Sequence, residues 1–104
     1  MRGNIAQLMQ QAQRVQDNLK RVQEELAAVE VGGQSGGGMV AVTITGKFEC
    51  RRVRIDPKAM DDADMLEDLI AAAFNDAVAN ANAEAARRTS AATAGLNLPP
   101  GMGF

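Results

Sequence analysis

The sequence predicts an α+β fold in which a long N-terminal helix, a three-stranded antiparallel β meander and a long C-terminal helix follow one another. Three observations predict it: an apolar heptad repeat over residues 5–26, strand-like runs within residues 39–55, and a second apolar stripe at helical spacing over residues 66–81. The length of 104 residues suits one domain. We expect residues 1–95 to form it, and residues 96–104 to be a tail that is flexible or docks on a partner surface.

The first helix carries a narrow apolar seam that alternates three and four residues without a Gly or Pro. We expect it to begin near Asn4, as a cap, and to end near Ala27 or Ala28. Only another helix lying along such a seam hides it, so the seam predicts a helix contact within the chain or in a dimer. Two long helices also overrun a compact domain of this size, which predicts an elongated molecule or a homodimer. The seam residues are Ile5, Leu8, Ala12, Val15, Leu19, Val22 and Leu26.

Three strands are expected between the helices. A short strand at about residues 29–34 overlaps the glycine-rich segment 32–38, which we interpret as a mobile turn or bulge. The second strand, residues 39–45, turns the side chains of residues 40, 42 and 44 to one face. The third strand, residues 48–55, changes phase at Arg51 and Arg52, which predicts a β-bulge there. Asp56 and Pro57 end it.

The second helix begins in a cluster of acidic residues at positions 61, 62, 64, 67 and 68. Acidic groups stabilise a helix N-terminus, so helix initiation explains the cluster, and a metal site would need carboxylates from several elements. The apolar stripe is bulky from Leu66 to Ile70 and dwindles to alanine by Ala81. This pattern predicts a helix that anchors on the sheet, ends in close helix contact and stops at Gly95.

The composition argues against an enzyme. The sequence has no His, Tyr or Trp, and its one cysteine, Cys50, has no histidine to activate it. We therefore expect a buried Cys50, no catalytic or metal site, no cofactor and no small-molecule substrate. The sequence also has no apolar run of membrane-spanning length and no signal-peptide pattern, which predicts a soluble, cytoplasmic protein without a membrane partner.

The formal net charge of −2 means that a polyanionic partner would have to meet a local basic patch. One candidate lies beside the seam of the first helix, where basic side chains share two neighbouring heptad positions. The end of the second helix would join it if the two helices pack antiparallel. The alternative is a solvated face on which Asp17, Glu24 and Glu25 form ion pairs with these cations. The patch residues are Arg14, Lys20, Arg21, Arg87 and Arg88.

The second candidate patch lies on the sheet, where residues 47–58 carry a net charge of +3. The alternative explanation is protection of a sheet edge, since charged side chains discourage pairing with foreign strands. A dimer would carry the patch twice, which favours a DNA contact. Its residues are Lys47, Arg51, Arg52, Arg54 and Lys58.

Several strings of residues, in this order, resemble the YbaB/EbfC family of bacterial nucleoid-associated DNA-binding proteins. They are LMQQAQRVQ, GGMVAVTITG, CRRVRIDP, MLEDLIAAAFNDA and LPPG. The resemblance implies a tweezer-like homodimer that binds double-stranded DNA with little sequence selectivity, lies in the nucleoid, organises the chromosome and affects gene expression. It favours the helical patch slightly. The alternative is a protein-interaction or scaffold module whose helices clasp another protein, consistent with the negative net charge.

Overall fold

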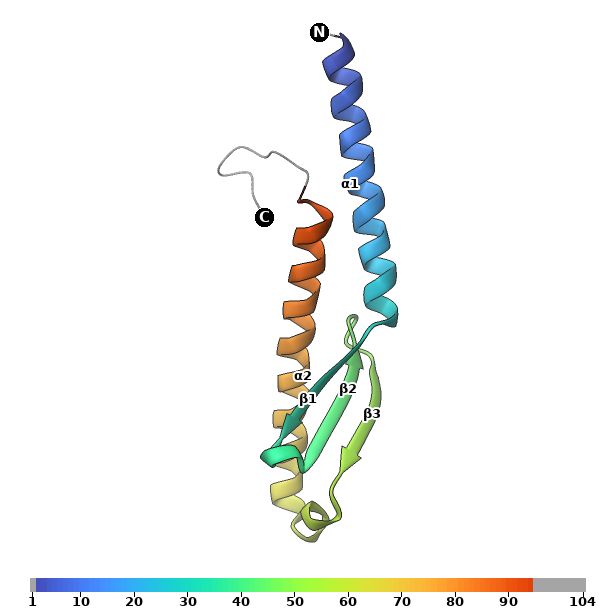
Figure 1. Cartoon of the computed structure of the whole chain (residues 1–104). Helices are drawn as coiled ribbons and strands as arrows, with labels where there is room; N and C mark the ends of the chain where they lie inside the picture. The colour runs from blue at the N-terminus through green and yellow to red at the C-terminus, as the bar shows by residue number, and fades with distance from the viewer. Residues whose placement is uncertain (1, 95–104) are drawn as a thin grey trace.

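The computed structural model describes residues 2–94, with side chains from Asn4 onward, and it confirms the predicted α+β architecture (Figure 1). The elements are α1 (Arg2–Ala28), β1 (Glu30–Ser35), β2 (Val40–Thr45), β3 (Cys50–Ile55) and α2 (Ala63–Ala92), with short 3-10 turns at Gly36–Gly38 and Pro57–Asp61. The sheet lies against the first half of α2, and α1 runs antiparallel to α2 and extends beyond its end. The predicted tail, residues 96–104, lies outside the described residues.

The molecule is elongated, with a radius of gyration of 19.7 Å and extents of 71 × 26 × 15 Å. A compact chain of this length would have a radius of gyration of about 13 Å. The expected elongation is therefore confirmed for the single chain.

The three strands form an antiparallel sheet in the order β1-β2-β3. Thr43 lies opposite Arg52 and Ile44 opposite Cys50, so Arg51 is an extra residue in β3 and the predicted bulge is confirmed. The strand begins two residues later than predicted because the turn after β2 is longer. In that turn the Phe48 amide donates to the Thr45 carbonyl at 2.9 Å, and Phe48 has a left-handed φ of 68°.

The core lies between β2 and α2. The side chains of Val40, Val42 and Ile44 are buried and share one face, as the alternation predicted. Opposite them, α2 presents the fully buried alanines 73, 77 and 81. Burying each large β2 side chain contributes about 1.5–3 kcal/mol, and the small alanines bring the helix close to the sheet.

Gly32 and Gly33 lie inside β1, which confirms the strand predicted at about residues 29–34 and limits the turn predicted across residues 32–38 to its last part. A Cβ atom on Gly33 would lie 2.5 Å from the Ala73 carbonyl oxygen, so α2 packs directly on the β1 backbone. The lack of a side chain at Gly33 therefore allows the backbones of β1 and α2 to approach closely. Only Gly36–Gly38 turn the chain, and all three have positive φ.

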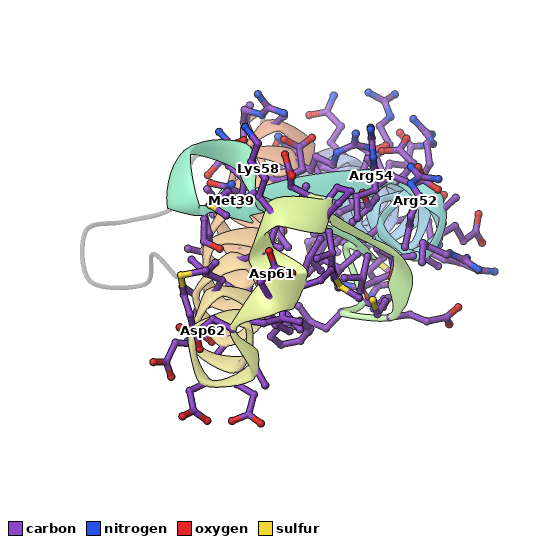
Figure 2. All side chains as sticks on the ribbon, turned by 90° about the horizontal axis from the view of Figure 1, so that it is seen from below. Met39, Arg52, Arg54, Lys58, Asp61 and Asp62 are labelled. Atoms are coloured by element: carbon purple, nitrogen blue, oxygen red, sulfur yellow. The ribbon has the colours of Figure 1, made fainter. Side chains whose placement is uncertain are left out.

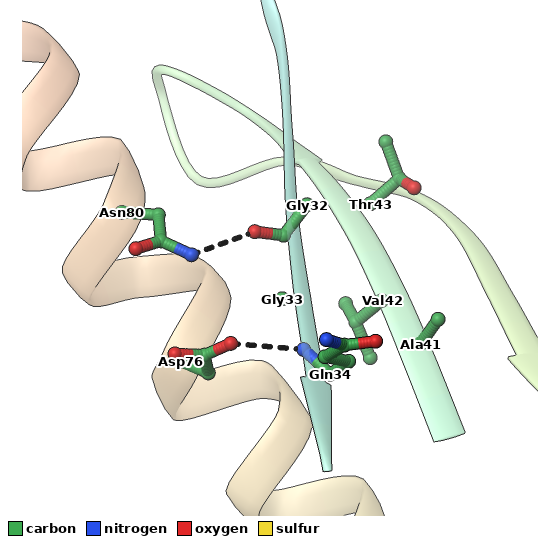
Figure 3. Close-up of a pocket in the computed structure, with 8 residues that line it drawn as sticks. All are labelled: Gly32, Gly33, Gln34, Ala41, Val42, Thr43, Asp76 and Asn80. Atoms are coloured by element: carbon green, nitrogen blue, oxygen red, sulfur yellow. Dashed lines mark hydrogen bonds between the residues drawn. The ribbon is translucent and has the colours of Figure 1, made fainter. Parts of the chain in front are cut away.

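Polar side chains of α2 form hydrogen bonds with backbone groups on the outer edge of β1 (Figure 3). The Gln34 amide donates to Asp76 Oδ2 at 3.0 Å, and Asn80 Nδ2 donates to the Gly32 carbonyl at 2.9 Å. The two spacings match, since four residues of helix rise about 6 Å and two residues of strand about 6.8 Å. The Ser35 hydroxyl adds a bond to the Leu69 carbonyl at 2.5 Å. These groups of β1 are thus already bonded and do not offer themselves to another strand.

Helix α2 starts as the acidic cluster predicted. The Asp62 side chain accepts from the Met65 amide at 3.1 Å, which is a helix N-cap. The helix ends at Ala92, with Thr93 as its C-cap, before the predicted stop at Gly95.

The seam of α1 divides into two halves. Val22 and Leu26 are buried, so the expected helix contact is made here by α2 of the same chain. Ile5 and Leu8 are 60% and 64% exposed, because α1 continues past the end of α2. Ala12 is also exposed, and Val15 and Leu19 are half-buried. The helix begins at Arg2, so Asn4 is inside it and is not the predicted cap.

Candidate nucleic-acid interface

The bulge in β3 sorts its side chains between two faces. Arg52 and Arg54 lie opposite Thr43 and Ala41, so they occupy the face that turns away from α2. Figure 2 shows Arg52, Arg54 and Lys58 toward one side of the molecule and Asp62 toward the side of α2. The chain thus carries cations on the outer sheet face and carboxylates at the start of α2, although its net charge is negative.

The sheet cations differ in how far neighbouring acids neutralise them. Arg51 pairs with Glu49 at 3.0 Å, and Arg52 lies 3.8 Å from a Glu30 oxygen. All four side chains are solvent-exposed, where an ion pair contributes little. The side chains of Arg54 and Lys58 form no ion pair within residues 4–94. The sheet patch therefore keeps open cationic groups.

The α1 cations are also open. Across the described side chains, Arg14, Lys20 and Arg21 make no ion pair, and two of the three nearby acids have other partners. Asp17 accepts a hydrogen bond from Gln13 at 3.1 Å, and Glu25 pairs with Arg88. Of the sheet patch, Lys47 reaches α1, where its ammonium donates to the neutral amide oxygen of Gln23.

The end of α2 is neutralised instead. Arg88 pairs with Glu25 of α1 at 2.9 Å and with Glu84 at 2.7 Å, and Arg87 also bonds Glu84. The hydrogen bonds from Arg87 and then Arg88 hold the pKa of the Glu84 carboxyl below its usual value, and the bond to Glu84 raises the pKa of Arg88. Arg88 thus reaches α1, as expected for antiparallel packing, but as the partner of an acid, whereas Arg87 bonds Glu84 of its own helix.

Arg21 nevertheless lies beside Arg88. Both line a crevice of about 270 Å³ between α1 and the end of α2, together with Asn18, Val22, Glu25, Ala91 and Ala92. The structure therefore brings one basic residue of each helix into a common crevice, while Arg14 lies about two helical turns from Arg21 toward the start of α1.

A second surface was not identified from the sequence. An apolar groove of about 490 Å³ runs between β3 and α2, because α2 covers β1 and β2 and leaves the inner face of β3 open. Val53 is 45% exposed there and Phe74 37%. Signals for it were present in the phase of Val53 and in Phe74 within the α2 stripe. The lining residues are Val42, Cys50, Val53, Glu67, Ile70, Ala71, Phe74 and Asn75.

Cys50 lines this groove and is exposed, which corrects the prediction of a buried cysteine. The physical reason is that, among the described residues, neither helix covers β3. Within residues 4–94, no three His, Cys, Asp or Glu side chains converge as metal ligands would. Neither α1 nor α2, over the part of the chain described, has the length and apolarity needed to cross a bilayer.

Comparison with known proteins agrees with the geometry. The sequence profile of the YbaB/EbfC DNA-binding family matches residues 1–96. The chain is 66% identical to a nucleoid-associated protein of Xanthomonas campestris pv. campestris (strain B100) over 102 residues, which are 98% of this chain and 96% of the relative. A nucleoid-associated protein of Xylella fastidiosa is 61% identical, over 98% of this chain and 95% of its own.

The fold has a counterpart among solved structures. The crystal structure of an uncharacterized Helicobacter pylori protein superposes with a TM-score of 0.60 and 22% sequence identity. The match covers 69% of this chain and 86% of that one. At this identity the likeness speaks for the shared fold alone.

Proposed function

Because this chain belongs to the YbaB/EbfC DNA-binding family, as the sequence motifs indicated, we propose that it binds duplex DNA as a non-enzymatic homodimer with little sequence selectivity. The observation that carries the proposal is the set of cations without an acidic partner among the described side chains. Arg14, Lys20 and Arg21 belong to α1, and Arg54 and Lys58 lie at the sheet. Phosphate contacts need such groups, since a cation already paired with a carboxylate would have to break that pair.

We place the main DNA contact on α1. Its three free cations lie on a helix that projects into solvent, where a duplex has access, whereas two arginines of β3 are paired with acids. Long polar side chains such as Gln7 and Gln13 accompany them and suit contacts to phosphate. Such contacts position a duplex without reading its bases, which accounts for low selectivity.

The β3–α2 groove supports a homodimer. Its lining is apolar apart from Glu67 and Asn75, and Phe74 stands half-exposed at its side. In a two-fold contact each copy offers the same surface, so the groove of one copy receives the apolar side chains of the other. The dimer would double the cations that face a duplex, and its proposed role in the nucleoid is to organise the chromosome and affect gene expression.

The test is a salt series of DNA affinity for the double variant Arg14→Ala, Arg21→Ala. It removes two cations per chain and four per dimer, and alanine preserves the helix. Each lost phosphate contact flattens the slope of log affinity against log salt by about 0.9, so full engagement predicts a change of up to about 3.6. The matched control is Arg87→Ala, which removes an arginine already bonded to Glu84 and should leave the slope nearly unchanged.

Two outcomes contradict parts of the proposal. An unchanged slope in the α1 variant with a flattened slope in Arg52→Ala, Arg54→Ala would move the DNA contact to the sheet. Absence of affinity at about 50 mM salt, where phosphate contacts are strongest, would overturn DNA binding and favour a module that clasps another protein.

A further inference from the structure

The free half of α1 exposes large apolar side chains in a row. Ile5, Leu8 and Met9 are 60%, 64% and 68% exposed, and Ala12 is exposed beside them. The row is the continuation of the seam that buries Val22 and Leu26 against α2. We call Ile5, Leu8, Met9 and Ala12 the distal stripe. Its spacing equals that of a packed surface, but α2 ends before reaching it.

The chain beyond α2 starts where the cover of the seam stops. Ala91 and Ala92 line the same crevice as Asn18, and Thr93 caps the helix. The helix rises about 20 Å from Asn18 to Ile5. Ten residues, 95–104, span up to about 33 Å when extended. The segment is therefore long enough to run along the whole distal stripe.

The composition of residues 95–104 suits an apolar stripe. The segment has no charged side chain and holds four large apolar ones, at Leu96, Leu98, Met102 and Phe104. Pro99 and Pro100 favour an extended backbone, which lies along a helix groove with its side chains directed to both sides. By helical spacing Ala6, Gln11 and Gln13 flank the distal stripe, so its cover would desolvate no charge there.

We propose that residues 95–104 dock on the distal stripe of their own chain and cover it in place of a longer α2. Arg14 and Arg21 occupy another heptad position than the stripe, so docking leaves them open to phosphate. The inference does not depend on DNA binding, and its tests do not use DNA.

Crosslinking tests the contact directly. In a Cys50→Ser background, the pair Leu8→Cys, Met102→Cys should form a disulfide under mild oxidation. The control pair Met60→Cys, Met102→Cys should not, because the exposed Met60 lies in the 3-10 turn at the opposite end of the molecule. Isotope-labelled and unlabelled chains are mixed before oxidation. Linked peptides of a single isotope support docking within one chain, whereas mixed pairs show a second copy on the stripe and overturn it.

Hydrogen exchange gives a second readout in a protein without cysteine pairs. The double variant Leu98→Ser, Phe104→Ser should speed amide exchange in residues 5–15 about tenfold, since a cover that slows local opening is removed. The control Asn97→Ser should leave it unchanged. Equal exchange in the double variant and the parent overturns the proposal, as does protection of residues 5–15 that depends on protein concentration.

Discussion

The two edge strands of the sheet, β1 and β3, differ in how far α2 covers them. On β1, α2 packs against the backbone at Gly33 and bonds two edge groups through Asp76 and Asn80. On β3 neither α1 nor α2, over residues 2–94, lies over Val53, and an apolar groove remains open. Helix α2 packs on this small sheet and covers β1 and β2. The difference shows that β1 is completed by α2 of the same chain, whereas the inner face of β3 stays open, where we propose the dimer contact.

The largest effect should follow from adding one methyl group where β1 meets α2. Gly33→Ala places a Cβ 2.5 Å from the Ala73 carbonyl oxygen, so backbone must move, and we expect a loss of about 3 kcal/mol in the free energy of unfolding. The control is Gly32→Ala, whose nearest atom would be the Val42 carbonyl oxygen at 4.0 Å. Urea unfolding at one fixed protein concentration measures both. Equal midpoints would mean that α2 does not rest on the β1 backbone.

A smaller effect is expected at the β3 edge, where a substitution should weaken the proposed dimer association. Phe74→Ser removes the aromatic side chain beside the β3 groove, and an anchor of this kind contributes about 2 kcal/mol to association. The dissociation constant of the dimer should rise about thirtyfold in sedimentation experiments. Leu8→Ser is the control, since Leu8 is more exposed but lies on the distal stripe. If Leu8→Ser dissociates the dimer and Phe74→Ser does not, the interface lies on the α1 seam instead.

The smallest effect is expected from removing the hydrogen bond between Asp76 and the β1 edge. Asp76→Ala leaves the Gln34 amide without its acceptor, which should lower the free energy of unfolding by about 1 kcal/mol. Asn82→Ala, at an exposed position of the same helix, should change it much less. Thermal melts compare the two variants. A loss confined to Asn82→Ala would contradict the role of Asp76 at the edge.

The local elements followed from the sequence because their causes are local. The heptad of α1, the alternation in β2, the phase change at Arg51 and the N-cap at Asp62 each depend on neighbours along the chain. Gly32 and Gly33 fell both in the predicted strand and in the overlapping predicted turn, since glycine marks both turns and close backbone approach. Only the position of α2 decides between them.

The candidate site was less predictable because it depends on the arrangement of whole elements. Charge spacing alone does not tell that Arg88 pairs with Glu25, 63 residues away, while Arg21 stays open. Cys50 was expected in a core, and it is exposed because α2 crosses β1 and β2 only. The DNA-contacting residues remain predictions. The structure distinguishes the candidate cations that form ion pairs with acids from those that do not, among the described side chains.

The close contact between the last turn of α1 and the sheet affects where the far end of α1 lies. Gly46 is buried beneath the last turn of α1, and a Cβ there would lie 2.7 Å from the Leu26 carbonyl oxygen. About 33 Å of helix extends from Leu26 to Asn4, so a tilt of α1 by about 10° at its contact with Gly46 moves the N-terminal end of the helix by about 6 Å. Successive phosphates of one DNA strand are separated by about 3.4 Å along the duplex axis. Under the proposed DNA contact on α1, the close approach at Gly46 therefore bears on which phosphates the helix reaches.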